Sequence, residues 1–154
     1  MRVLGIDAGS RRVGLAVSDA SASLARPWQT LEAGPTPAAT ADRIAAAVEA
    51  EARATLGDFD IGAIVVGLPR RLGGEDTHGT AGARALAAAL GKRLGVPVHL
   101  QDERLTSREA EALLAQREPD WRERKKLIDA TAAALVLQDF LDAASPVPPP
   151  SEEP

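Results

Sequence analysis

The chain contains no cysteine, and only two of its 154 residues are histidine. The lack of cysteine excludes disulfides and cysteine-ligated zinc, and it is typical of a reducing compartment. With so few histidines, a metal site would be built on carboxylates, which favours Mg²⁺ or Mn²⁺. There is no run of about 18 apolar residues to span a membrane. Charged residues interrupt the apolar start, so we expect no signal peptide and a cytoplasmic protein.

The composition is that of an ordinary globular domain, with 45% hydrophobic and 26% charged residues. The length predicts a single domain over residues 1–143. Residues 144–154 are rich in proline and lack apolar periodicity, which predicts a disordered tail. The formal net charge of −4 argues mildly against a nucleic-acid binder, because such proteins usually carry a basic surface.

Two apolar runs of strand length, residues 2–7 and 13–19, flank a short polar link and predict a β-hairpin. Gly9 lies in the link and can adopt a positive φ, which would let the chain reverse there. Asp7 ends the first strand, where a buried carboxylate needs compensation. A bound cation is one candidate, and backbone amides around a phosphate are another. A solvated aspartate that opens the turn is the simpler alternative.

The rest of the chain alternates strands with helices. Strands are expected at 26–32, 61–67 and 96–101, and helices at 37–56, 78–94, 106–116 and 126–143. Thr36 followed by Pro37 is a favoured helix start. Right-handed crossovers between such elements predict an α/β fold in which helices flank a mixed central sheet of about five strands.

Two further acids occupy unusual positions. Glu103 follows the strand 96–101, which we expect to lie inside the sheet, and ligand sites in α/β proteins gather at strand ends. An exposed charged turn is the alternative for this segment. Asp129 shares a helix face with apolar residues that continue to Phe140. The helix dipole favours an acid near the helix start, but it does not explain an acid on the apolar face.

These three carboxylates, Asp7, Glu103 and Asp129, can converge at one end of one sheet. Carboxylates brought together repel one another, and their pKa values would rise without a cation. Divalent metal ions remove that cost. Two such ions can also activate a water and stabilise the leaving oxygen of a phosphodiester. The residues therefore point towards metal-dependent hydrolysis.

Four segments, in this order, carry a family resemblance: residues 5–19 (GIDAGSRRVGLAVSD), 65–69 (VVGLP), 102–106 (DERLT) and 125–133 (KKLIDATAA). In these segments the sequence resembles the YqgF/RuvX family of bacterial proteins, which belongs to the RNase H-like superfamily together with the RuvC resolvases. The resemblance implies an RNase H-like fold and a divalent-metal-dependent nuclease. It matches Asp7, Glu103 and Asp129 to the acidic catalytic triad, which would hold the metal. The implied role is 5′-end trimming of precursor 16S rRNA or, by similarity to RuvC, resolution of Holliday junctions.

A phosphodiester substrate needs cations to meet its phosphates. The candidates beside the four segments are Arg11, Arg12, Arg70, Arg71, Arg104, Arg124, Lys125 and Lys126. The alternative for each is a solvated surface charge. Trp121 could stack on an unpaired base, or it could attach its segment to the core.

The sequence does not decide whether the substrate is RNA or branched DNA. It also does not decide whether the protein is a monomer or a homodimer. A resolvase that cuts two strands symmetrically requires a two-fold dimer. The Asp-x-Gly-Ser start at Asp7 also opens actin-like ATPases and sugar kinases, but these need a second domain for which 154 residues leave no room. A non-catalytic RNA or ribosome-assembly factor gains nothing from three acids facing phosphate.

Overall fold

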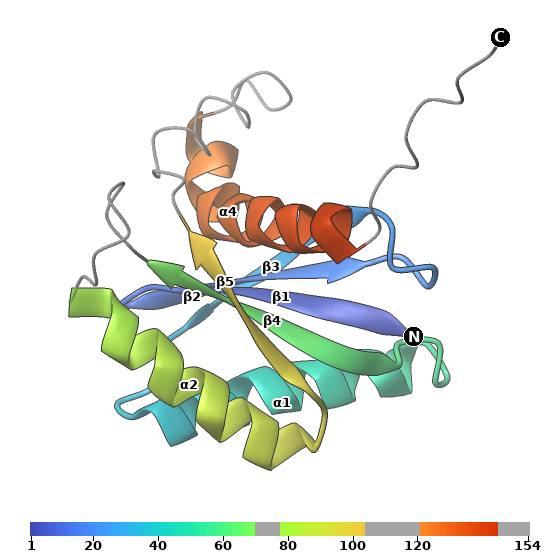
Figure 1. Cartoon of the computed structure of the whole chain (residues 1–154), viewed down its shortest axis with the longest axis horizontal. Coiled ribbons are helices and arrows are strands. Elements are labelled where there is room, and N and C mark those ends of the chain that lie inside the picture. The colour runs from blue at the N-terminus through green and yellow to red at the C-terminus, as the bar shows by residue number, and fades with distance from the viewer. Residues whose placement is uncertain (70–77, 104–120, 145–154) are drawn as a thin grey trace, which may run out of the picture.

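The computed structural model describes residues 1–69, 78–103 and 121–144, and Figure 1 shows their arrangement. Side chains are described for residues 1–69, 79–102 and 128–144. The strands are β1 (Arg2–Ala8), β2 (Arg12–Ser18), β3 (Ala25–Glu32), β4 (Ile61–Pro69) and β5 (Val98–Glu103). The helices are α1 (Pro37–Ala54), α2 (His78–Leu94) and α4 (Trp121–Ala144).

The five strands form one mixed sheet in the order β3-β2-β1-β4-β5. Strand β1 is antiparallel to β2 and parallel to β4, and β5 continues the parallel part. The predicted hairpin and the α/β fold are confirmed. The expectation that the strand before Glu103 lies inside the sheet is wrong. Within the described residues β5 is an edge strand, because no later strand pairs with its free side.

Several predicted boundaries need correction. Strand β4 continues to Pro69, and β5 runs from Val98 to Glu103 rather than over residues 96–101. Helix α4 begins at Trp121, five residues before the expected helix start at residue 126. Its first turns are rich in Arg, Lys and Glu, which favour helix but give no apolar periodicity to reveal it. The expected helix at 106–116 and most of the expected tail lie outside the described residues.

The start of α1 is confirmed in detail. The Thr36 hydroxyl accepts a hydrogen bond from the Ala39 amide at 3.1 Å, and Pro37 occupies the first turn. The helix ends at Ala54, and the following Leu56 and Gly57 both have positive φ, which reverses the chain. None of the described helices is long and apolar enough to span a membrane.

The helices cover the two faces of the sheet unequally, as Figure 1 shows, with α1 and α2 below it and α4 above. Alternation along β1 sends Leu4 and Ile6 into the core under α1 and α2. Val3 belongs to a smaller core on the other face, where α4 contributes Ala133 and Leu137. The same alternation assigns Asp7 to the α4 face, in line with Val3.

Helix α4 lies unusually close to the hairpin because two sheet positions are glycine. A Cβ on Gly14 would lie 1.9 Å from the backbone oxygen of Asp129. A Cβ on Gly5 would lie 2.7 Å from the Leu137 Cβ. Both distances are shorter than real Cβ contacts allow. The helix backbone therefore rests directly on the strands.

The hairpin turn does not use Gly9 as predicted. Gly9 is not among the residues with positive φ. Its amide instead donates a hydrogen bond to the Arg12 carbonyl at 2.9 Å, and a Cβ on Gly9 would lie 2.7 Å from that oxygen. Glycine is needed here for the close backbone approach.

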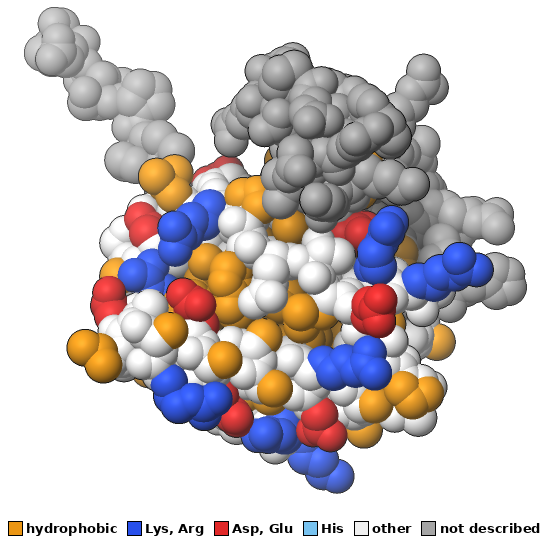
Figure 2. Space-filling model, turned by 180° about the vertical axis from the view of Figure 1, so that it is seen from behind, with side chains coloured by type: hydrophobic (Ala, Val, Ile, Leu, Met, Phe, Trp, Pro, Cys, Tyr) orange, Lys and Arg blue, Asp and Glu red, His pale blue; other side chains and the backbone are white. Residues whose placement is uncertain are grey.

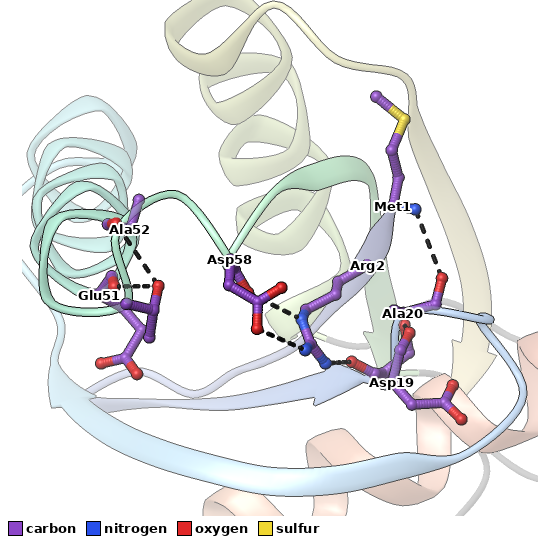
Figure 3. A network of polar contacts seen from close by, with 9 residues as sticks. Met1, Arg2, Asp19, Ala20, Glu51, Ala52 and Asp58 are labelled. Atoms are coloured by element: carbon purple, nitrogen blue, oxygen red, sulfur yellow. Dashed lines mark hydrogen bonds and ion pairs between the residues drawn. The ribbon is translucent and has the colours of Figure 1, made fainter.

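The opposite end of β1 is tied by the network in Figure 3. The Arg2 guanidinium donates to the backbone oxygens of Ser18 and Asp58, at 3.2 and 3.4 Å. Hydrogen bonds from the backbone amides of Ser23 and Leu24 hold the pKa of the Asp19 carboxyl well below its usual range. These contacts fix the loops at the end of the sheet away from Asp7.

We expect Gly14→Ala to lower the free energy of unfolding by at least about 3 kcal/mol, because the added methyl group must displace the α4 backbone. Urea unfolding measures the change. Gly82→Ala in α2 is the matched control, since its Cβ would meet nothing within 4 Å. That substitution should stabilise by about 0.5–1 kcal/mol through helix propensity. Equal effects at the two sites would contradict the close contact.

Candidate active site

Asp7 and Asp129 come together through the contact at Gly14. Asp7 pairs with Gly14 in the β1–β2 register, and the Asp129 backbone lies over Gly14. Both acids are partly buried on the α4 face. One turn of α4 thus carries Asp129 to the strand end where Asp7 lies, as the sequence predicted for these two residues.

Glu103 lies at the same end of the sheet. It is the last residue of β5 and pairs with Pro69, the last residue of β4. Strand β4 also pairs in parallel with β1, with Ile6 opposite Val66. Because β1, β4 and β5 run in parallel, their carboxyl ends share one edge. The side chain of Glu103 lies outside the described residues, so the structure places only its backbone.

An ion pair joins the hairpin turn to α4. The Arg12 Nε lies 3.0 Å from Asp129 Oδ2, and the two side chains are 51% and 25% exposed. The Oδ2 atom itself is buried, and it accepts no well-aligned hydrogen bond in the described part of the chain. The contact is therefore an electrostatic pair through one nitrogen rather than a bidentate salt bridge. A buried anionic oxygen that lacks a hydrogen bond has capacity left for a cation.

The other predicted cations are only partly placed. Arg11 is exposed in the hairpin turn, next to Arg12. The first turns of α4 contain Trp121, Arg124, Lys125 and Lys126, whose side chains lie outside the described residues. Arg70, Arg71 and Arg104 also lie outside them. The structure thus brings one predicted cation, Arg12, into contact with a predicted acid.

On one face of the molecule the described charge is mixed rather than uniformly basic (Figure 2). Figure 2 shows one face on which Lys and Arg side chains alternate with Asp and Glu around an apolar centre. The described part of this face has no continuous basic stripe. The described side chains, which do not include that of Glu103, form no group of three or more His, Asp or Glu able to hold a metal.

Sequence reasoning missed two residues that position the site. Gln138 in α4 accepts from the Ala25 amide at 2.9 Å and donates to the Ser23 carbonyl at 3.0 Å, which fixes the helix against the β2–β3 loop. The Thr80 hydroxyl donates to the Pro69 carbonyl at 2.6 Å and holds the end of β4. No local signal reveals Gln138, because its partners are more than 110 residues away in the sequence. Thr80 is a threonine in a helical first turn, which by itself suggests only a cap.

A known family matches most of the chain. A family model described as "RuvX: Holliday junction resolvase" matches residues 1–143. Among curated relatives, a Maridesulfovibrio salexigens protein is 40% identical over 94% of this chain and 100% of its own length. A Nocardioides relative is 41% identical over 90% of this chain and 86% of its own length. Both are named "Putative pre-16S rRNA nuclease".

Solved structures show a similar fold. Thermus thermophilus RuvC, solved with a Holliday junction substrate, superposes with a TM-score of 0.53 at 22% identity, over 94% of this chain and 95% of that one. The fowlpox virus Holliday junction resolvase gives a TM-score of 0.54 at 9% identity, over 94% and 99%. At these identities the likeness concerns the fold, and the predicted RNase H-like architecture is confirmed.

Replacement by valine should change the free energy of unfolding in opposite directions at two buried threonines, Thr131 and Thr80. Thr131 lies two residues after Asp129 in α4, and its Oγ1 has no hydrogen-bond partner among the described residues. We expect Thr131→Val to raise the free energy of unfolding by about 1 kcal/mol, and Thr80→Val to lower it by about 1–3 kcal/mol. Thermal or urea unfolding of both variants measures this. A loss of stability in Thr131→Val would show that its hydroxyl is hydrogen-bonded.

Proposed function

This chain belongs to the RuvX family, and we propose that it is a divalent-metal-dependent nuclease acting in 5′-end processing of precursor 16S rRNA. The observation that carries the proposal is the juxtaposition of Asp7 and Asp129 across Gly14, at the strand end where β5 also delivers Glu103. The relatives named for pre-16S rRNA support the choice of substrate. We assign the activity to a single domain over residues 1–143 and to the cytoplasm.

The proposed metal ligands are the carboxylates of Asp7, Glu103 and Asp129. Hard oxygen ligands suit Mg²⁺ or Mn²⁺. The buried Asp129 Oδ2, which lacks an aligned hydrogen bond among described residues, fits such a role. Bound divalent ions would supply an activated water and stabilise the leaving oxygen. The chain itself holds the acids in place through the sheet register and the close packing of α4.

Cations near the strand end would bind the substrate phosphates. We propose this role for Arg11, Arg12, Arg70, Arg71, Arg104, Lys125 and Lys126. Arg11 and Arg12 are the described members, and both are exposed in the hairpin turn beside Asp7. Such contacts position a nucleic acid without reading its sequence. Substrate choice would then depend on shape and on groups elsewhere in the chain.

Holliday-junction cleavage is the second candidate, favoured by the description of the family model. The same acids would serve both reactions. Symmetric cleavage of two strands needs a two-fold dimer, whereas trimming of one RNA end can be done by a monomer. The oligomeric state on the substrate therefore separates the two functions.

We expect Asp7→Asn to reduce cleavage at least about a hundredfold, because it removes a charged metal ligand worth several kcal/mol in the transition state. The assay uses Mg²⁺ or Mn²⁺ with two labelled substrates, an RNA carrying a precursor 16S 5′ leader and a four-way DNA junction. Asp58→Asn is the matched control, since it removes the same charge near Arg2 at the far end of β1.

Cleavage of the RNA, lost in Asp7→Asn and kept in Asp58→Asn, supports the ribonuclease. Paired symmetric cuts in the junction would favour the resolvase instead. Full activity in a folded Asp7→Asn variant would contradict both functions. Circular dichroism of each variant separates a lost ligand from a lost fold.

A further inference from the structure

We propose that Arg12 is a displaceable counter-ion of Asp129, which occupies the carboxylate in the metal-free protein and turns to a substrate phosphate when a divalent cation binds. This inference rests on the proposed function, because it takes Asp129 as a metal ligand. It adds a positioning role for Arg12, which the triad alone does not contain.

The pair has the features of a contact that can be exchanged. Arg12 approaches Asp129 Oδ2 through Nε alone, at 3.0 Å, and without hydrogen-bond alignment. Bidentate arginine–carboxylate pairs are stronger and fix their geometry better. Half of the Arg12 side chain is exposed, so water already solvates much of the cation. A partly exposed pair of this kind contributes little net stability.

The structure also determines which partner moves. The Asp129 backbone is wedged against Gly14, and the carboxylate oxygen that faces Arg12 is buried. Arg12 instead follows the hairpin turn, on a long side chain with several rotatable bonds. Displacement therefore moves the arginine outward and leaves the acid in place. Ser10 and Arg11, which precede Arg12 in the hairpin turn, are exposed as well.

Charge balance gives the exchange a direction. Without a metal, Arg12 offsets the charge of a carboxylate that lies close to Asp7. A divalent cation carries twice the charge of the guanidinium and binds two or more carboxylates at once, so it replaces the arginine. Release of Arg12 then provides a cation at the point where the phosphate enters. Metal binding would thus prepare the site for the substrate.

Mn²⁺ affinity without substrate tests the first half of the exchange, with free Mn²⁺ measured by electron paramagnetic resonance. We expect Arg12→Gln to bind Mn²⁺ about fivefold more tightly than wild type, because no arginine competes for Asp129. A fivefold change corresponds to about 1 kcal/mol. Arg11→Gln is the matched control, since it removes the same charge from the adjacent exposed position, and it should change the affinity by less than about twofold.

The two variants distinguish exchange from general repulsion. Tighter binding in Arg12→Gln alone supports the proposal. Equal changes in both variants would show that only the overall charge matters, which overturns it. Weaker binding in Arg12→Gln would mean that Arg12 merely supports the structure, which also overturns it. Asp129→Asn tests the proposed function separately: unchanged Mn²⁺ affinity there would remove Asp129 from the ligand set.

A measurement on the wild-type protein covers the case in which a variant fails to fold. The ¹⁵Nε resonance of Arg12 should shift as Mg²⁺ saturates the protein, whereas that of Arg11 should stay unchanged. An Arg12 signal that does not move at saturating Mg²⁺ overturns the exchange.

The second half of the exchange, the contact between Arg12 and a substrate phosphate, is tested by RNA binding in Ca²⁺. We expect Arg12→Gln to bind the leader RNA more weakly than wild type. The slope of log affinity against log salt concentration should fall in magnitude by about one phosphate contact. An unchanged salt dependence would overturn that step.

Discussion

The close contact between Gly14 and the backbone at Asp129 is the constraint on which the rest of the site depends. Gly14 is paired with Asp7 in the hairpin, so the helix that touches Gly14 is carried to within reach of that acid. Any side chain at position 14 would lift α4 from the sheet and separate the two carboxylates. The depth of the helix on the sheet and the proximity of the two acids therefore depend on one missing Cβ.

The same constraint explains why the two cores differ. The face under α1 and α2 carries large residues such as Leu4, Ile6 and Leu15. The α4 face must admit a helix backbone, so its sheet positions include Gly5, Gly14 and Ala16, and less apolar surface is buried there. Gln138 compensates in part, because it joins α4 to the β2–β3 loop by two hydrogen bonds.

Which features the sequence could predict depends on how far apart in the chain the interacting residues lie. Apolar runs and the Thr36–Pro37 cap are local, so the strands and the start of α1 were predictable. The acids Asp7 and Asp129 were found because each conflicts with its local pattern. The edge position of β5 and the pair between Arg12 and Asp129 depend on contacts between distant segments. Neither periodicity nor composition reports such contacts. The start of α4 was missed for a different reason, because its charged first turn shows no apolar periodicity.

The net charge of −4 can also be reconciled with a nucleic-acid substrate through the site itself. A strand end with clustered carboxylates repels phosphate, so an acidic chain without a metal would bind nucleic acid poorly. Under the proposed function each divalent cation reverses the sign of the field at the point where the phosphate must enter. If the same cation also frees Arg12, the net charge of the site rises only by that of the metal, but a guanidinium that was paired with Asp129 becomes available to the phosphate. A basic surface is then unnecessary, because attraction is confined to the metal-bound site.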